Sequence, residues 1–152
     1  MELSKKTKEY WKEKDWQDLE KSQNIKDLYT IAERVISRMP KPMVSVCGPI
    51  ATGGFGSIDK NLELFNNEII KLQKNLINVF DQMPFEDMMQ KLKITMGLDQ
   101  CCKSIVDDFY LPIFNSGYIS DFYFIKNWES SNGAKWEHEI AKKLGIKINY
   151  LN

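Results

Sequence analysis

Residues 43–57, MVSVCGPIATGGFGS, determine the fold that this sequence predicts. The apolar run 43–47 has the length and composition of a buried strand, and it ends abruptly at Gly48. After the glycine-rich loop, Ser57 is a good N-cap for a helix whose apolar residues recur every three or four positions. Residues 77–80 are again strand-like. A strand, a helix and a strand at this spacing predict a βαβ unit, and therefore a parallel sheet.

The downstream sequence continues this alternation. Pro84 is well placed in the first turn of a helix, and residues 98–114 carry apolar side chains at helical spacing. Residues 122–125 are strand-like. The segment 133–144 predicts a helix closed by a C-terminal glycine, and 146–151 predicts the last strand. The class is therefore α/β, with a small doubly wound sheet.

Residues 1–42 and residues 43–152 differ in composition and in hydrophobic pattern. Residues 43–152 carry the α/β pattern. Residues 1–42 are rich in charge and contain no glycine, and their apolar side chains recur at helical spacing. We expect one or two amphipathic helices there, forming an N-terminal helical extension. This extension is either a packing arm or dimer contact, or the surface for a specific partner.

Composition excludes several classes of protein. The chain has 152 residues, with 21 Lys plus Arg and 21 Asp plus Glu, so its formal net charge is zero. Proteins that bind a nucleic acid polymer or an anionic membrane usually carry a basic excess. Three cysteines form no disulfide framework, and no apolar run approaches the roughly 18 residues of a membrane span. We expect a cytoplasmic protein. One histidine, His138, with scattered carboxylates predicts no metal site.

Ligands of open parallel sheets bind beyond the carboxyl ends of the strands. The loop 48–56, with four glycines, reaches that edge. It has neither the Lys-Ser/Thr of a P-loop nor the G-x-G-x-x-G of a dinucleotide site. It is either a turn that requires positive φ or a loop whose amides approach a ligand. Asp81 and the pair Glu86-Asp87 follow the second strand and either contact a base or sugar or form a solvated face.

The segment 128–137 reaches the same edge. Ser131 or Asn132 can cap the following helix, which places Glu137 near the end of its first turn. The helix dipole favours a carboxylate there by about 0.3–1 kcal/mol. We therefore expect Glu137 to be ionised at neutral pH and able to act as a nucleophile. The alternative is an ordinary glutamate in a capping region.

Residues 133–145 follow the pattern G-A-x-W-E-x-x-x-A-x-x-L-G, which resembles the nucleoside 2-deoxyribosyltransferase family. The segment 47–50, the glycines 53–54, Asp121 and Ser131 extend the resemblance over about residues 43–151, most closely to the 2′-deoxynucleoside 5′-phosphate N-hydrolases. It implies a small Rossmann-like (flavodoxin-like) three-layer fold with four or five parallel strands. It also implies a homodimer or a larger homo-oligomer, and chemistry without a metal or an organic cofactor.

The resemblance assigns roles to single residues. Glu137 corresponds to the nucleophile that attacks C1′ of the sugar and expels the base. Ser131 stands where nucleoside transferases have Asp, which favours a phosphorylated substrate. The second catalytic acid has no clean counterpart; Asp108 is our choice, with Asp107 next. The substrate-binding residues would be Gly48, Ile50, Thr52, Gly53, Gly54, Ser131, Asn132 and Gly133.

Two positions depart from the family. Ser45 stands where many members have a tyrosine that contacts the nucleophile, and the loop 48–57 lacks the arginine of the hydrolases. The sequence predicts cleavage of the N-glycosidic bond of a (deoxy)nucleoside 5′-monophosphate or nucleoside, by hydrolysis or by base transfer through a glycosyl-glutamate. The alternative is a non-catalytic nucleotide-binding module of the same fold. Either way the partner is a small molecule, not a nucleic acid polymer or a membrane.

Overall fold

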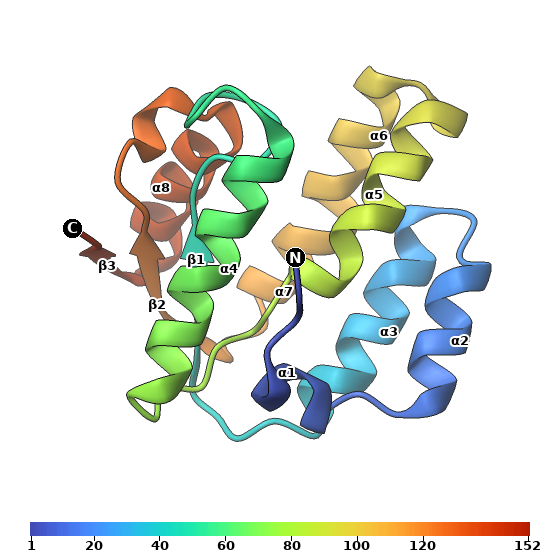
Figure 1. Ribbon diagram of the computed structural model, residues 1–152, viewed down its shortest axis with the longest axis horizontal. Helices are drawn as coiled ribbons and strands as arrows, with labels where there is room; N and C mark the ends of the chain where they lie inside the picture. Colours follow the sequence, from blue (N-terminus) through green and yellow to red (C-terminus); the bar gives the residue numbers. More distant parts are fainter.

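The computed structural model describes all 152 residues and shows a parallel sheet with helices on both faces and a further group of helices beside it (Figure 1). The three strands lie in the order β1 (Met43–Cys47), β2 (Ile119–Phe124) and β3 (Lys147–Tyr150). The helices in chain order are α1 (Lys5–Glu9), α2 (Glu13–Lys21), α3 (Ile25–Ser37), α4 (Ile58–Lys74), α5 (Met83–Met96), α6 (Leu98–Ser104), the π-helical segment η1 (Ile105–Tyr110), α7 (Leu111–Phe114), the 3₁₀ turn η2 (Trp128–Ser130) and α8 (Asn132–Leu144).

The sheet has fewer strands than the four or five predicted. The expected strand at 77–80 makes a single parallel bridge, between Val79 and Val44. Two backbone hydrogen bonds hold it, from Val44 N–H to the Asn78 carbonyl at 2.8 Å and from Phe80 N–H to the Val44 carbonyl at 2.9 Å. The pairing stops there because Asp81 turns the chain into α5, where its carboxylate accepts the Met83 N–H at 2.9 Å. The bridge still places this segment beside β1, opposite β2.

The side chains of β1 alternate between two clusters, as a buried strand requires. Val44 and Val46 pack with Phe65 and Ile69 of α4 on one face of the sheet. Cys47 faces the other cluster, which also holds side chains of α3, α5, η1, α7, β2 and α8. Of the predicted βαβ unit, β1 and α4 are present, and the second strand is reduced to the bridge at Val79. Ser57 caps α4 as expected, accepting the Lys60 N–H at 3.2 Å. The sheet is covered on both faces, and its carboxyl edge is left for a site.

The first 42 residues form three helices, where the sequence predicted one or two. Their apolar side chains belong to the larger cluster, in which Trp11 and Leu28 lie with Phe85 and Phe122. Figure 1 shows α2 and α3 beside α5, on the side of the molecule away from β3. The N-terminal helices therefore provide part of the packing that holds α5 in place.

A buried carboxylate links these helices. Asp15, only 1 % exposed, accepts the Lys12 N–H at 2.8 Å and hydrogen bonds from Arg34, at 3.0 Å, and Arg38. Burial alone would raise the pKa of Asp15, but the hydrogen bonds from Arg38, the Lys12 amide and Arg34 together lower it. A carboxyl group whose pKa is lowered by folding stabilises the native state above its unfolded pKa, and this contribution disappears as pH falls.

We therefore expect Asp15→Asn to lower the free energy of unfolding by about 2 kcal/mol at neutral pH, since charged hydrogen bonds contribute about 1.5–3 kcal/mol. Urea denaturation measures the change, and the difference from wild type should shrink below about pH 4. Asp18→Asn is the control, because Asp18 also pairs with Arg34 but is 28 % exposed. An equal or larger effect of the control would contradict this account.

Candidate active site

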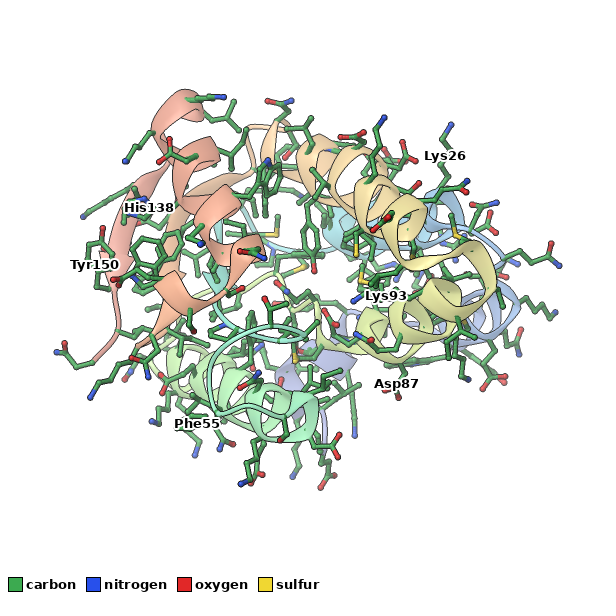
Figure 2. All side chains as sticks on the ribbon, turned by 90° about the horizontal axis from the view of Figure 1, so that it is seen from above. Lys26, Phe55, Asp87, Lys93, His138 and Tyr150 are labelled. Carbon is green, nitrogen blue, oxygen red and sulfur yellow. The ribbon has the colours of Figure 1, made fainter.

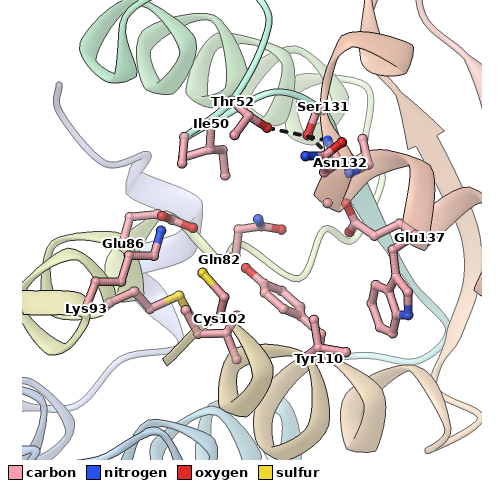
Figure 3. Close-up of a pocket in the computed structure, with 18 residues that line it drawn as sticks. Ile50, Thr52, Gln82, Glu86, Lys93, Cys102, Tyr110, Ser131, Asn132 and Glu137 are labelled. Carbon is pink, nitrogen blue, oxygen red and sulfur yellow. Dashed lines mark hydrogen bonds between the residues drawn. The ribbon is translucent and has the colours of Figure 1, made fainter. Parts of the chain in front are cut away.

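A cavity of about 490 Å³ opens at the carboxyl edge of the sheet (Figure 3). Its wall is formed by the loop after β1, the first turns of α8, one face of α5, and side chains of α6 and η1. The volume lies within the range of about 300–1,000 Å³ found for small-molecule sites. The cavity lies where the chain leaves β1 and β2, with the Val79 bridge on the far side of β1. Strand order reverses at this point, which is where ligands of open α/β sheets bind.

Most of the residues predicted for the site come together in this cavity, although the predicted second acid does not. Glu137 lines it, and Asp108 and Asp107 lie outside its lining. Gly53 and Gly54 are also outside the lining. The remaining predicted residues all line the cavity: Gly48, Ile50, Thr52, Ser131, Asn132 and Gly133.

Gly53 and Gly54 shape the loop from behind. Both have positive φ, 70° and 66°, a conformation that favours glycine. A Cβ on Gly53 would collide with the Ser130 backbone, and one on Gly54 would collide with the Asn61 amide. The Gly54 N–H donates to Ser130 Oγ at 2.8 Å. These two glycines thus dock the loop on η2 and α4, and the residues before them face the cavity.

The N-terminus of α8 also faces the cavity. Ser131 is its N-cap, as predicted, and its buried Oγ accepts the Ala134 N–H at 3.2 Å. The Asn132 N–H points to Thr52 Oγ1 at 3.4 Å, so the loop and the helix terminus lie side by side. The first-turn amides of a helix lack intrahelical acceptors and carry partial positive charge. This wall of the cavity therefore suits an anionic group.

Glu137 is 9 % exposed and pairs with no cation. Burial raises its pKa to about 8; the neighbouring Cys47 thiol lowers the pKa, and the charge of Glu86 raises it. The expectation of an ionised Glu137 at neutral pH is therefore wrong for the ligand-free protein. The helix dipole contributes only about 0.3–1 kcal/mol, and desolvation of a buried carboxylate outweighs it.

Glu86 is the second carboxyl group in the cavity. It lies on α5, is 4 % exposed and has no ion pair within 4 Å. Burial raises its pKa to about 7; Lys93, Gln82 and Gln90 lower the pKa, and Asp87 raises it. The sequence placed Glu86 at the correct edge of the sheet, but nothing in it distinguished this glutamate from the exposed Asp87.

The π-helical segment η1 explains why Asp108 does not line the cavity. It buries Phe109 in the core and leaves Asp107 exposed and Asp108 at intermediate exposure. Tyr110, at its end, lines the cavity, and its hydroxyl lies between Glu86 and Glu137 (Figure 3). Burial, with the nearby acidic groups, raises the pKa of Tyr110 well above its usual value, so the phenol stays neutral and can donate a hydrogen bond.

Lys93 is the only basic residue that lines the cavity. No carboxylate lies within 4 Å of its ammonium group. Figure 2 shows Lys93 pointing inward and Asp87 pointing out from the same helix. A ligand in the cavity thus meets one free cation.

The other candidates lie outside the cavity. His138 stacks on Trp128, with ring centroids 4.3 Å apart, and its Nε2 is 2.8 Å from the Tyr150 hydroxyl. Both His138 and Tyr150 lie at the outer side of the molecule (Figure 2). No three His, Cys, Asp or Glu side chains gather in a way that could hold a metal ion. None of the helices combines the length and the apolar character needed to cross a membrane.

Comparison with known proteins reaches only the C-terminal part of the chain. Residues 117–150 match the model of a family described as a domain of unknown function, DUF4406. The match spans β2, α8 and β3, and it includes Ser131 and Glu137 but neither the glycine loop nor α5. No curated protein and no solved structure matches the chain. The resemblance to nucleoside 2-deoxyribosyltransferases therefore stays a prediction.

Proposed function

We propose that this protein cleaves the N-glycosidic bond of a nucleoside 5′-monophosphate or a nucleoside, with Glu137 as the nucleophile. The observation that carries the proposal is the pair of buried carboxyl groups, Glu137 and Glu86, which face one cavity without an ion pair. Burying such groups destabilises a protein, so a ligand site is the natural reason for them. Covalent glycosyl cleavage uses two carboxyl groups with different tasks. A small Rossmann-like fold, which the parallel sheet supports, is part of the same proposal.

The two carboxyl groups would divide the reaction. An oxygen of Glu137 bonds to C1′ while the bond from C1′ to the base nitrogen breaks. The electron pair of the broken bond goes to the base, which receives a proton from Glu86. Water or a second base then attacks C1′ and releases the Glu137 carboxylate, and Glu86 takes up the proton. Positive charge that develops on the sugar favours the ionised form of Glu137, so bound substrate lowers the pKa of this group.

The other wall would hold the sugar and the phosphate. The first turn of α8 reaches the cavity with the Gly133 amide, and Thr52, whose Oγ1 accepts the Asn132 N–H at 3.4 Å, adds a hydroxyl that can donate. A phosphate there interacts with the helix dipole and its free N–H groups. This local arrangement replaces the loop arginine that the chain lacks.

We expect the pH profile of kcat/KM to be bell-shaped, with its maximum between about pH 7 and 8. Glu137 must lose its proton to attack, so activity falls on the acid side. Glu86 must keep its proton for the base, so activity falls on the alkaline side. The pKa values of about 8 and about 7 belong to an interacting pair, so the limbs report the pair as a whole. Steady-state rates in buffers of constant ionic strength measure the profile, and a flat profile from about pH 6 to 9 would contradict these roles.

Ser131→Asp tests the phosphate position. Aspartate is also a good N-cap, so it can still accept the Ala134 N–H, but it brings a negative charge to the cavity wall. We expect kcat/KM for a 5′-monophosphate to fall about tenfold or more, because like charges at close range repel strongly. The unphosphorylated nucleoside should be affected much less. Ser131→Asn, a neutral cap, is the matched control, and equal losses for both substrates would argue against a phosphate there.

The test of the function itself is release of free base. The folded wild-type protein is incubated with ribo- and deoxyribonucleosides and with their 5′-monophosphates, and free base is separated by chromatography. Release supports the proposal and names the substrate class, and an added second base separates hydrolysis from transfer. Nucleotide binding without any release would favour the non-catalytic binding module instead.

A further inference from the structure

One face of α5 lines the cavity with mainly polar side chains. Gln82, just before the helix, and Glu86, Met89 and Lys93 on it are spaced by four, three and four residues, which is the spacing of a single helix face. Glu86 and Lys93 therefore lie on the same face of the helix, about two turns apart. Figure 3 shows both on the side of the cavity opposite Glu137. The face thus presents a free ammonium group beside a carboxyl group.

The position of this face decides which part of a ligand it meets. In the proposed function, C1′ of the sugar lies at Glu137, and the phosphate lies at the N-terminus of α8. The base must then extend toward α5, between apolar side chains such as Met89, Ile105 and Val106 that suit the faces of an aromatic ring. Lys93 and Glu86 are the charged groups available to the edge of that ring.

We infer that Lys93 makes the site selective for oxo bases. These bases have a carbonyl oxygen at the ring position where adenine and cytosine have an amino group. This inference rests on the proposed function, because the direction of the base follows from C1′ at Glu137. A lysine ammonium group has three donors and no acceptor. It therefore binds a carbonyl oxygen and cannot bind an amino group, which is itself a donor.

The purine case shows the fit. A 6-oxopurine has two adjacent acceptors, N7 and O6, on one edge. Glu86 would give its proton to N7, and Lys93 would donate to O6. Adenine keeps N7 but turns its N6 amino group toward the ammonium group, which leaves two donors face to face and unpaired. Lys93 therefore discriminates between O6 and the N6 amino group, which lie on the same edge of the purine as N7, the atom that receives the proton.

The test compares two sets of nucleotides, each with one oxo base and its amino counterpart. The first set is the deoxynucleoside 5′-monophosphates of hypoxanthine and adenine, and the second is those of uracil and cytosine. Calorimetric titration into Glu137→Gln measures binding with the chemistry blocked, and kcat/KM on the unmodified protein measures turnover. We expect hypoxanthine to be favoured over adenine by about 10- to 100-fold. In Lys93→Met the ratio should fall to about one. Lys91→Met, a lysine on the exposed side of α5, should retain it.

The outcomes separate this inference from the proposed function. Equal binding of both members in each pair, or an unchanged ratio in Lys93→Met, would overturn the inference even if the protein releases bases. A binding preference that depends on Lys93 in a protein that releases no base would support the inference and overturn the proposed reaction.

Discussion

Glu137→Gln is expected to lower the rate of base release by about 10³-fold or more, because an amide is a poor nucleophile and the glycosyl ester with C1′ no longer forms. The amide has nearly the volume of the carboxyl group that it replaces, so the cavity and α8 should be retained. Glu139→Gln is the matched control, since Glu139 lies on the same helix with its side chain 65 % exposed. Chromatography of released base measures the loss. A Glu137→Gln protein as active as wild type would exclude the proposed mechanism.

The same substitution should change stability in a pH-dependent way. Folding raises the pKa of Glu137 from an unfolded value of about 4.3 to about 8. Such a group contributes stability below its unfolded pKa, and the contribution is lost as pH rises through the folded pKa. Glu137→Gln removes the cost of ionising a buried carboxyl group. In urea denaturation it should therefore be more stable than wild type near pH 9, and the difference should be smaller near pH 5.

Glu86→Gln is expected to lower base release by about 10²- to 10⁴-fold, the usual contribution of a general acid. The glutamine side chain cannot transfer a proton to the leaving base, so the alkaline limb of the pH profile should also disappear. Asp87→Asn is the control, because Asp87 is the exposed neighbour on the same helix. Steady-state kinetics measure both effects.

A substrate that needs no proton sharpens the test of Glu86. In a nucleotide of N7-methylated guanine the base carries a positive charge, so this base can leave without being protonated. We expect Glu86→Gln to cleave it at nearly the wild-type rate. If this substrate suffers the full loss, Glu86 acts by positioning the base and not by giving it a proton.

Local signals predicted much of this structure. The apolar run that ends at Gly48, the cap at Ser57, and the pair of Ser131 and Gly145 around α8 each act within a few residues, and each lies where it was expected. The position of Glu137 follows from them, because the N-cap fixes the phase of α8. This is why its place beside the glycine loop could be predicted from sequence.

Features that depend on tertiary packing could not be predicted in this way. Glu86 faces the cavity and Asp87 faces solvent because α2 and α3 orient α5, and two adjacent acidic residues give no local sign of this. The π-helical turn places Tyr110 in the wall of the cavity and Asp108 outside it. This turn has no clear sequence pattern. The protonation of Glu137 depends on the depth of its burial, which outweighs the helix dipole that the sequence indicated.

The proposed mechanism requires a covalent bond between Glu137 and C1′ of the sugar. A 2′-deoxy-2′-fluoro nucleotide tests it most directly, because fluorine next to C1′ destabilises the oxocarbenium-like transition state by which the ester breaks down. Intact-protein mass spectrometry after base release should show one added glycosyl group. Peptide mapping should place that group on Glu137, and Glu137→Gln should show no addition. One equivalent of base released per chain with no gain in protein mass would contradict the account.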